Sequence, residues 1–516
     1  MSKFSKEWKW FGVGLIGILV LALGLRIYHL TLLPVFVDEA IYIRWSQIMA
    51  SEPTLRFLPL SDGKQPLYMW ILMFLVRRFG DPLFAGRLVS ALAGMGTVLG
   101  VMGVSYLLFN SKRSTLAAGL FWVLSPFALF FDRMALVDSL LTSLTVWTLF
   151  LGILTVKTRR FDMAILTGFA LGFAALTKSS AIFAAGLLFS VWILGDFGKK
   201  KQREVRVVWA GLLMMVIYII ALAMYNIQRL GPNFHLLASR TRDYVYPMSH
   251  LWTSPMDPFV PYFDRAMEWL VIMGPSMLLV LGFLALLGEK KYWKEKLILL
   301  VWFLGPVVVQ AVFAKTFTAR YILFALPPLF VLAGSALEGK GIKKIAVILA
   351  LGVFVVQSVI FDYKLLTNVE SANLPRSERS GYLEEWTAGT GIVQASKLLQ
   401  REASESENHI VVGTEGYFGT LPDGLQMYMD GVPGVTVIGI GLNIKEVSTQ
   451  LVEARGAGSR AYLLANTSRL RFEKTPEELG LRLAGEWAKA KRPGDVREWF
   501  FYGERDYLQL WEYVGE

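Results

Sequence analysis

The sequence predicts an α-helical polytopic membrane protein with a C-terminal soluble α/β domain. Three observations support this fold class. The 516-residue chain is 54% hydrophobic with a mean hydropathy of +0.47, many apolar runs approach bilayer length, and the composition becomes mixed and polar after about residue 361. A helix needs about 20 apolar residues to cross the hydrocarbon core. We therefore expect a membrane domain over 1–361 and an α/β domain over 362–516.

Eleven apolar segments are expected to cross the membrane as helices. The first runs from Trp10 to about Leu25, after the basic residues Lys3, Lys6 and Lys9. Because it is longer than a signal-peptide core and no small-residue cleavage site follows it, we expect a retained first helix. The other ten segments run roughly over 83–109, 114–131, 137–156, 162–177, 180–195, 206–228, 268–288, 296–314, 319–337 and 343–361.

Lys and Arg residues are concentrated in every second loop between these segments. By the positive-inside rule these loops and the N-terminus are cytoplasmic, so the alternate loops and the C-terminal domain are expected outside the cell (plasma or inner) membrane. The formal charge of +11 follows this pattern, so nucleic-acid binding is not expected. The basic loops contain Lys112-Arg113, Lys157 with Arg159-Arg160, Lys199–Lys201 with Arg203, Lys290-Lys291 with Lys294 and Lys296, and Lys340 with Lys343-Lys344.

Two further regions complete the predicted fold. Leu67–Val76 is apolar but too short to span a bilayer, so we expect an interfacial helix that lies on the outer surface within the first outer loop. In the C-terminal domain, strand-like runs alternate with helix-like stretches, which is typical of a small α/β domain. The strand-like runs are His409–Val412, Val435–Gly439 and Ala461–Ala465, and the helix-like stretches are Ile392–Arg401 and Glu446–Ala454.

The acidic pair Asp38-Glu39 lies about ten residues beyond the first span, in an otherwise apolar and aromatic stretch. Carboxylates against a bilayer are costly to desolvate unless they are paired or used. The pair is therefore a candidate general base. The alternative is that it caps the interfacial helix that follows, because acids are favoured at a helix start and in its first turn.

Most of the other predicted outer segments also carry charge where a helix meets the surface. Cations suit a phosphate or another anion, and a carboxylate beside them suits removal of a proton from a hydroxyl. Together they indicate transfer from a phosphate-linked donor to a hydroxyl acceptor. The absence of Cys excludes thiol nucleophiles, and the four His residues lack metal-ligand spacing. The charged positions are Lys64, Asp132-Arg133, Asp138, Lys178, Lys315 and Arg320 with Tyr321.

Structural roles also fit several of these residues. Arg133 and Asp138 could form an interfacial ion pair, and Lys178 and Lys315 could extend to lipid headgroups, as we expect for Arg26. A polytopic transporter or lipid flippase would explain the hydropathy, but broken helices, midplane charges and often internal repeats would be expected. A non-enzymatic envelope protein would explain the C-terminal domain but would not need five charged outer sites.

At the positions that carry these charges, the sequence resembles the GT-C membrane glycosyltransferases that use polyprenyl-phosphate sugars. The similarity is to the protein O-mannosyltransferase and aminoarabinose-transferase type, and it covers most of residues 1–361. Each motif is short, and the specificity comes from five of them in order. They are Val37-Asp38-Glu39-Ala40-Ile41-Tyr42, Lys64-Gln65-Pro66-Leu67-Tyr68, Asp132-Arg133-Met134-Ala135-Leu136-Val137-Asp138, Leu176-Thr177-Lys178, and Arg320-Tyr321 preceding Pro327-Pro328.

The resemblance implies a mannosyltransferase-like membrane enzyme of the cell envelope. It would move a monosaccharide from a polyprenyl-phosphate donor to a hydroxyl acceptor (protein, lipid or glycan), with inversion, on the outer face. By the same resemblance, Asp38 would be the general base with Glu39 supporting the site. The implied substrate-binding residues are Lys64, Lys178 and Arg320 for the phosphate, Arg133 and Asp138 for positioning, and Tyr321.

The chain also departs from the patterns of related branches. Aminoarabinose transferases usually have Glu before their Lys-Pro motif, whereas Gly63 and Gln65 flank Lys64 here, so that acceptor specificity is not expected to carry over. The tryptophan-rich acceptor motif of oligosaccharyltransferases is absent from the C-terminal domain, which argues against Asn-linked transfer. A divalent metal ion would be compatible with the site, but the number of cations makes it dispensable.

Overall fold

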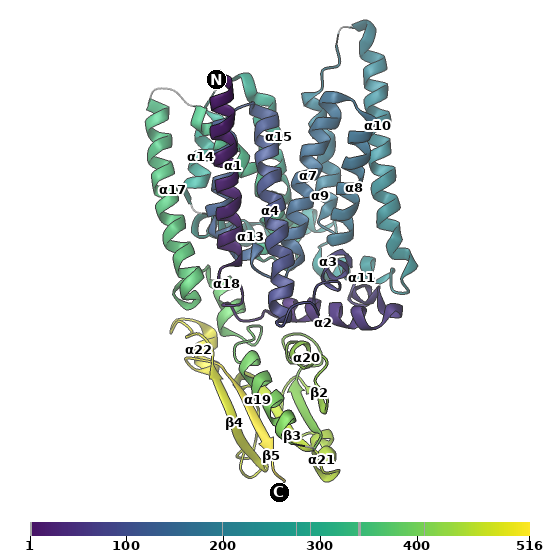
Figure 1. Cartoon of the computed structure of the whole chain (residues 1–516), viewed down its shortest axis with the longest axis vertical. Coiled ribbons are helices and arrows are strands. Elements are labelled where there is room, and N and C mark those ends of the chain that lie inside the picture. Colours follow the sequence, from purple (N-terminus) through teal and green to yellow (C-terminus); the bar gives the residue numbers. More distant parts are fainter. Residues whose placement is uncertain are drawn as a thin grey trace. The chain divides into compact units, whose positions relative to one another are not determined.

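The computed structural model describes residues 3–198, 200–274, 276–288, 290–338, 342–406 and 408–515 (Figure 1). Lys199 and Lys340, which belong to predicted basic loops, lie outside the described residues. The chain divides into two compact units. We call Met1–Leu30, Thr54–Ile71 and Arg87–Pro375 the membrane unit, and Thr31–Pro53, Leu72–Gly86 and Arg376–Glu516 the C-terminal unit.

The membrane unit is a bundle of helices. All eleven predicted apolar segments fall on them, because a long apolar run can satisfy its backbone in lipid only by forming a helix. The helices are α1 (Lys3–Ile27), α3 (Leu67–Leu72), α4 (Pro82–Phe109), α5 (Lys112–Leu124), α6 (Pro126–Asp132), α7 (Val137–Thr158), α8 (Phe161–Thr177), α9 (Ala181–Leu187), α10 (Lys200–Asn226), α11 (Leu236–Tyr244), α12 (His250–Thr253), α13 (Phe259–Ile272), α14 (Ser276–Leu286), α15 (Trp293–Phe313), α16 (Pro327–Ser335) and α17 (Ile342–Thr367).

The eleven predicted spans are not eleven straight helices. Among the described residues, six helices are long and apolar enough to cross a membrane, or nine if each of three bent pairs is one span. The remaining two segments are the shorter apolar helices Phe161–Thr177 and Ala181–Leu194. Bends of 60° and 54° occur where Pro126 and Pro327 begin a new helix, since proline lacks the N–H that would continue the preceding one.

The predicted interfacial helix is wrong in its extent. Only Leu67–Leu72 is helical, and turns follow it through residue 78. Tyr68 and Met69 are fully buried, whereas Phe74 in the turns that follow is 64% exposed, so protein covers this segment on one side only. The tyrosine hydroxyl lies 3.1 Å from Ser90 Oγ on α4, which fixes the segment against a span.

Close helix packing in the membrane unit depends on small residues. Helix α8 packs against both α7 and α10, which lie beside it in Figure 1. A Cβ on Gly168 would approach Ile220 to 2.8 Å, and one on Gly172 would approach the sulfur of Met224 to 2.5 Å. This Gly-xxx-Gly spacing on one face of α8 lets α10 approach closely, as small residues do in many membrane bundles.

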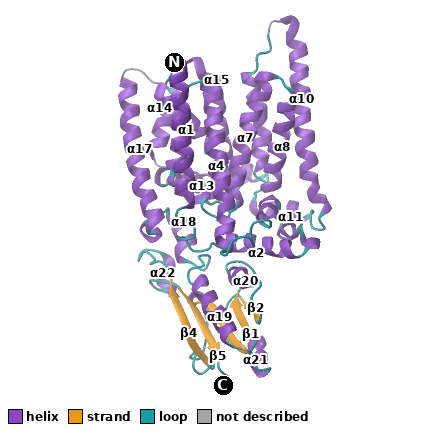
Figure 2. Ribbon diagram, viewed as in Figure 1, coloured by secondary structure: helices purple, strands orange, loops and turns teal. Residues whose placement is uncertain are grey.

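The C-terminal unit contains a five-stranded sheet in the order β2-β1-β3-β5-β4, whose strands are orange in Figure 2. Strands β2, β1 and β3 are parallel, and β5 and β4 pair antiparallel. The three predicted strand-like runs fall on β1, β2 and β3. The elements are α2 (Val37–Ser51), α18 (Arg376–Arg379), α19 (Ile392–Glu405), β1 (Ile410–Glu415), α20 (Asp423–Met429), β2 (Val435–Gly441), α21 (Thr449–Gly456), β3 (Arg460–Asn466), β4 (Leu481–Ala488), α22 (Arg497–Tyr502) and β5 (Tyr507–Tyr513).

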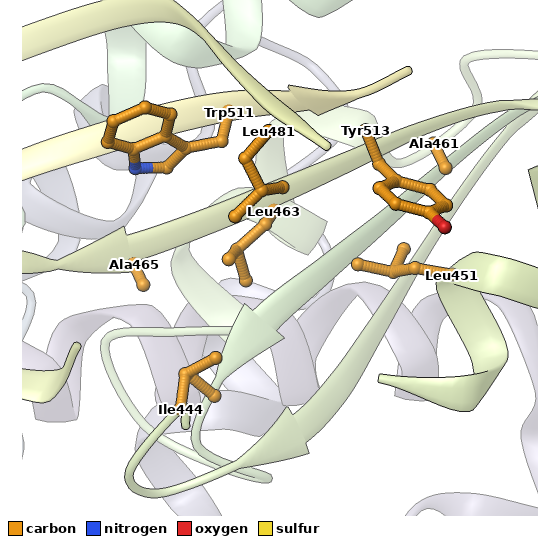
Figure 3. Packing of buried hydrophobic residues seen from close by; sticks show 8 residues of the cluster. All are labelled: Ile444, Leu451, Ala461, Leu463, Ala465, Leu481, Trp511 and Tyr513. Carbon is orange, nitrogen blue, oxygen red and sulfur yellow. The ribbon is translucent and has the colours of Figure 1, made fainter. Parts of the chain in front are cut away.

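One hydrophobic cluster packs on a face of this sheet (Figure 3). Ala461, Leu463 and Ala465 alternate along β3 and therefore point to the same side. Trp511 of β5 and Leu451 of α21 pack into the same cluster. Tyr462 and Leu464, which lie between the three β3 residues, are buried too, so β3 is covered on both faces, as is usual for a central strand of an α/β sheet.

A buried carboxyl in this unit predicts a pH dependence of stability. Burial raises the pKa of Glu415 from 4.5 to about 6, although the backbone N–H and the side chain of Asn466 donate to it, each at 2.7 Å. The unfolded chain therefore releases this proton at lower pH than the folded chain. Stability should fall as pH rises from about 4.5 to 6, by roughly 2 kcal/mol.

Differential scanning calorimetry of the full-length protein measures this effect. Glu415→Gln keeps an oxygen acceptor but cannot ionise, so the variant should lack this part of the pH dependence. An identical pH profile for wild type and variant between pH 4.5 and 7 would contradict the assignment.

Candidate active site

The centre of the candidate site is an ion pair between two predicted residues. Lys178 Nζ donates to Asp138 Oδ1 at 2.6 Å. Asp138 lies in the first turn of α7 and is almost fully buried, where a carboxylate also suits the positive end of the helix dipole. Lys178 is the residue that ends α8, and its side chain is 21% exposed. The pair therefore joins two helix ends and leaves the ammonium partly accessible.

Two of the cationic residues that were predicted to bind the phosphate lie near the ring of Tyr321. Lys178 Nζ is 4.1 Å from the centre of its ring, and the Arg320 guanidinium carbon is 5.5 Å from it. Both distances fall within the range of cation–π attraction. Arg320 and Tyr321 belong to the 3₁₀ helix Ala319–Ala325, which precedes α16. The structure thus gathers Asp138, Lys178, Arg320 and Tyr321 at the helix ends opposite the start of α1.

The Lys64–Tyr68 segment is hydrogen-bonded to the turn that follows Lys178. Gln65 Nε2 donates to Ser179 Oγ at 2.6 Å, and Ser179 directly follows Lys178. The sequence analysis included Gln65 in a motif but assigned neither Gln65 nor Ser179 to the site. The only signal was the polar turn Lys178-Ser179-Ser180 between two apolar spans, which has little other reason to be polar.

Lys64 lies one residue before Gln65 and is held by a local charge network. Its Nζ is 3.4 Å from Asp62 Oδ2, and Arg240 of α11 also pairs with Asp62. Gly63 between them has a φ of +63°, a left-handed conformation that favours glycine. A Cβ there would also meet the Arg240 side chain at 2.5 Å. Glycine at this position therefore lets α11 cover the loop.

Arg133 has different contacts from those the sequence predicted. Its Nη1 donates to the carbonyls of Leu25, Arg26 and Tyr28, and its Nη2 donates to that of His29. These carbonyls lie at the end of α1, where no further helical N–H is available and a cation is favoured. The suggested Arg133–Asp138 ion pair is wrong, because Asp138 pairs with Lys178. Substrate positioning by Arg133 stays a prediction.

Arg26 was expected to reach lipid headgroups, and this expectation is wrong. Its Nε and Nη2 both donate to Asp132 Oδ2, at 3.0 and 2.8 Å, and both side chains are fully buried. Gly94 of α4 makes room for the pair, since a Cβ there would lie 2.4 Å from Asp132 Oδ2. Burying two charges is tolerable when they pair this closely, so the pair ties α1 to α6.

The acidic pair of the first loop lies at the start of α2 in the C-terminal unit. Glu39 is fully buried, and its Oε2 accepts from the backbone N–H of Phe36 at 2.9 Å, which caps the helix. Asp38 is half-buried in the same first turn. Two backbone bonds fix this turn: Val37 donates to Thr387 at 3.1 Å, and Gly389 donates to Val35 at 2.7 Å.

The two acids of the pair therefore differ in burial and in their contacts. The capping alternative describes Glu39, whereas Asp38 is the more accessible carboxylate. The role of Asp38 as the general base stays a prediction.

Two solved structures resemble the whole chain. The structure of ArnT from Cupriavidus metallidurans in the apo state matches with a TM-score of 0.53 at 13% identity, covering 98% of each chain. The same protein bound to undecaprenyl phosphate matches with a TM-score of 0.53 at 15% identity, covering 97% of this chain and 98% of that one. A search of the curated proteins found no match. The chain thus has the fold of these ArnT structures over nearly its whole length.

Residues 63–225 match the family described as Dolichyl-phosphate-mannose-protein mannosyltransferase. The matched segment contains the Lys64–Tyr68, Asp132–Asp138 and Leu176–Lys178 motifs, whereas Asp38 and Arg320 lie outside it. The resemblance that the sequence indicated, and the membrane fold with a C-terminal α/β domain, are confirmed.

Proposed function

We propose that the protein transfers a monosaccharide from a polyprenyl-phosphate donor to a hydroxyl acceptor, with inversion, on the outer face of the membrane. The observation that supports this most directly is the Lys178–Asp138 pair with Arg320 and Tyr321 beside it. Partly exposed cations on rigid helix ends can hold a phosphate without reorganising. The ArnT structure that contains undecaprenyl phosphate supports the same class of donor.

In this proposal Lys178 and Arg320 bind the phosphate and stabilise the charge that develops on it. As the bond between the anomeric carbon and the phosphate oxygen breaks, the leaving polyprenyl phosphate gains one negative charge. Fixed cations aimed at that oxygen stabilise the transition state more than the ground state. Lys64 is proposed to help hold the phosphate, and the Tyr321 ring to set the positions of both cations.

We propose different roles for Asp138 and Asp38. Asp138 Oδ2 is buried and has no hydrogen-bond partner among the described residues. We therefore assign it to accept a hydrogen bond from a hydroxyl group of the donor sugar. Asp38 is proposed as the general base that takes the acceptor proton as the acceptor oxygen attacks the anomeric carbon. A single displacement of this kind inverts that carbon. Glu39 supports Asp38 indirectly by fixing the start of α2.

The proposed phosphate contacts come from Lys and Arg. In the part of the chain that the structure describes, no three His, Asp or Glu side chains are grouped so as to hold a metal ion. Metal dependence can be measured directly by adding a chelator to the transfer assay.

Mass spectrometry of lipids that co-purify with the full-length protein tests the donor class. A bound polyprenyl phosphate, displaced by added undecaprenyl phosphate, is the expected result. Glycans from cells with and without the protein should then differ by one monosaccharide, which identifies sugar and acceptor. Retention of ordinary phospholipids alone, with no affinity for undecaprenyl phosphate, would contradict the proposal and favour a transporter without transferase chemistry.

A further inference from the structure

A cavity of about 1270 Å³ lies in the membrane unit at the end of the bundle where α1 begins. Its walls come from the start of α1, the turn between α4 and α5, the end of α14, and the starts of α15 and α17. Figure 1 marks this end with N. Because so many spans start or end here, the cavity lies where the bundle meets the membrane surface. Its described lining includes none of the candidate active-site residues.

The lining carries charges of both signs. Its cations are Lys112, Arg113 and Lys296, and its carboxylates are Glu7 and Glu338. Lys296 is 7% exposed, and a Cβ on Gly288 at the end of α14 would lie 3.3 Å from its Nζ.

The two carboxylates are held at the rim by neighbouring groups. Lys112 Nζ lies 3.7 Å from Glu7 Oε2, and Ser111 Oγ donates to Glu338 Oε1 at 2.5 Å. Ser111 also caps α5 by accepting from the Ser114 N–H at 3.2 Å. Contacts with the start of α5 therefore hold both acids in position.

Most of the remaining walls are apolar, and some of these side chains are exposed. Leu116, Leu284 and Val347 line the cavity, and Trp10 and Leu287 also line it while being 67% and 49% exposed. Exposed apolar side chains on a membrane-spanning bundle face hydrocarbon. A small soluble anion would leave these walls uncovered, whereas a lipid would place its chains against them.

We propose that this cavity binds a phospholipid with an ethanolamine-type zwitterionic headgroup. The lipid phosphate binds among the three cations, in charge-assisted hydrogen bonds. The headgroup ammonium binds Glu7 and Glu338, and the acyl chains follow the apolar walls. Basic pockets between membrane helices are a recurring type of lipid headgroup site. The two carboxylates disfavour an anionic headgroup that has no amine, such as that of a polyprenyl phosphate.

Native mass spectrometry of the delipidated full-length protein tests the site, with phosphatidylethanolamine and phosphatidylglycerol of identical acyl chains. Wild type should bind phosphatidylethanolamine more tightly. Lys112→Gln with Arg113→Gln should weaken its binding about 25-fold, at about 5-fold for each cation lost. The matched control is Arg159→Gln with Arg160→Gln, which removes two cations from a turn at the same end that does not line the cavity. This control should bind as wild type does.

Two further results test which headgroup the cavity prefers and whether lipid binding there is independent of the candidate active site. Glu7→Gln with Glu338→Gln should abolish the preference for phosphatidylethanolamine while phosphatidylglycerol binds at least as well. Affinity for undecaprenyl phosphate should not change in any of these variants. Equal phosphatidylethanolamine binding by wild type and the Lys112/Arg113 variant would overturn the site. Tighter binding of phosphatidylglycerol by wild type would overturn the zwitterionic headgroup.

Discussion

Asp38→Asn is expected to lower sugar transfer by about 10²- to 10⁴-fold, because the amide cannot take the acceptor proton. Asparagine retains the size of aspartate and loses only the interaction of the charge with the helix dipole, about 0.3–1 kcal/mol, so folding should be preserved. Affinity for undecaprenyl phosphate should also be preserved, since Asp38 is not assigned to the phosphate. The measurements are turnover by the purified full-length variant and its lipid affinity.

Glu52→Gln provides a matched control, because Glu52 is an exposed carboxylate at the other end of α2. This variant should turn over as wild type does. The pH profile of Asp38→Asn gives a second readout, since loss of the base should remove the acidic limb of kcat. Near-normal turnover by Asp38→Asn would show that another group acts as the base.

Lys178→Ala should have the second-largest effect and should act on two properties at once. Loss of a charge-assisted contact to the donor phosphate should weaken undecaprenyl phosphate binding about 10- to 100-fold. Asp138 would also keep its buried charge without the cation 2.6 Å away, which should lower the melting temperature. Lipid affinity and thermal unfolding measure the two properties separately.

A double variant separates these two effects. In Lys178→Ala with Asp138→Asn the buried charge is gone, so thermal stability should largely return while donor binding stays weak. Lys364→Ala is the control: it removes an exposed lysine in the last turn of α17 and should leave both properties unchanged. Recovery of donor affinity in the double variant would mean that Lys178 only neutralises Asp138.

The membrane fold was largely predictable because hydropathy and loop charge are properties of the linear chain. The bends at Pro126 and Pro327 carried a signal in the prolines themselves, although the apolar runs continue across them. The short extent of the helix at Leu67 had no such signal, because its end depends on packing around Tyr68. Strands β4 and β5 were missed because their apolar residues are interspersed with charged ones, as in Leu481-Arg482-Leu483.

The candidate site was predictable as a set of residues but not as a set of contacts. Motif order selected Asp138, Lys178, Arg320 and Tyr321, and the structure brings these four together. Which acid pairs with which cation depended on helix packing. Arg133, only five positions from Asp138 in the chain, donates instead to the carbonyls that end α1.

The sequence by itself determined the class of protein, the position of each apolar helix and the residue types available for chemistry. These follow from the cost of burying polar groups in hydrocarbon, which acts on each segment independently. Only the tertiary structure decided that Lys178 pairs with Asp138, that Arg26 pairs with Asp132, and that Glu39 caps α2. Those choices depend on distances of a few ångströms between segments far apart in the chain, and close packing alone sets such distances.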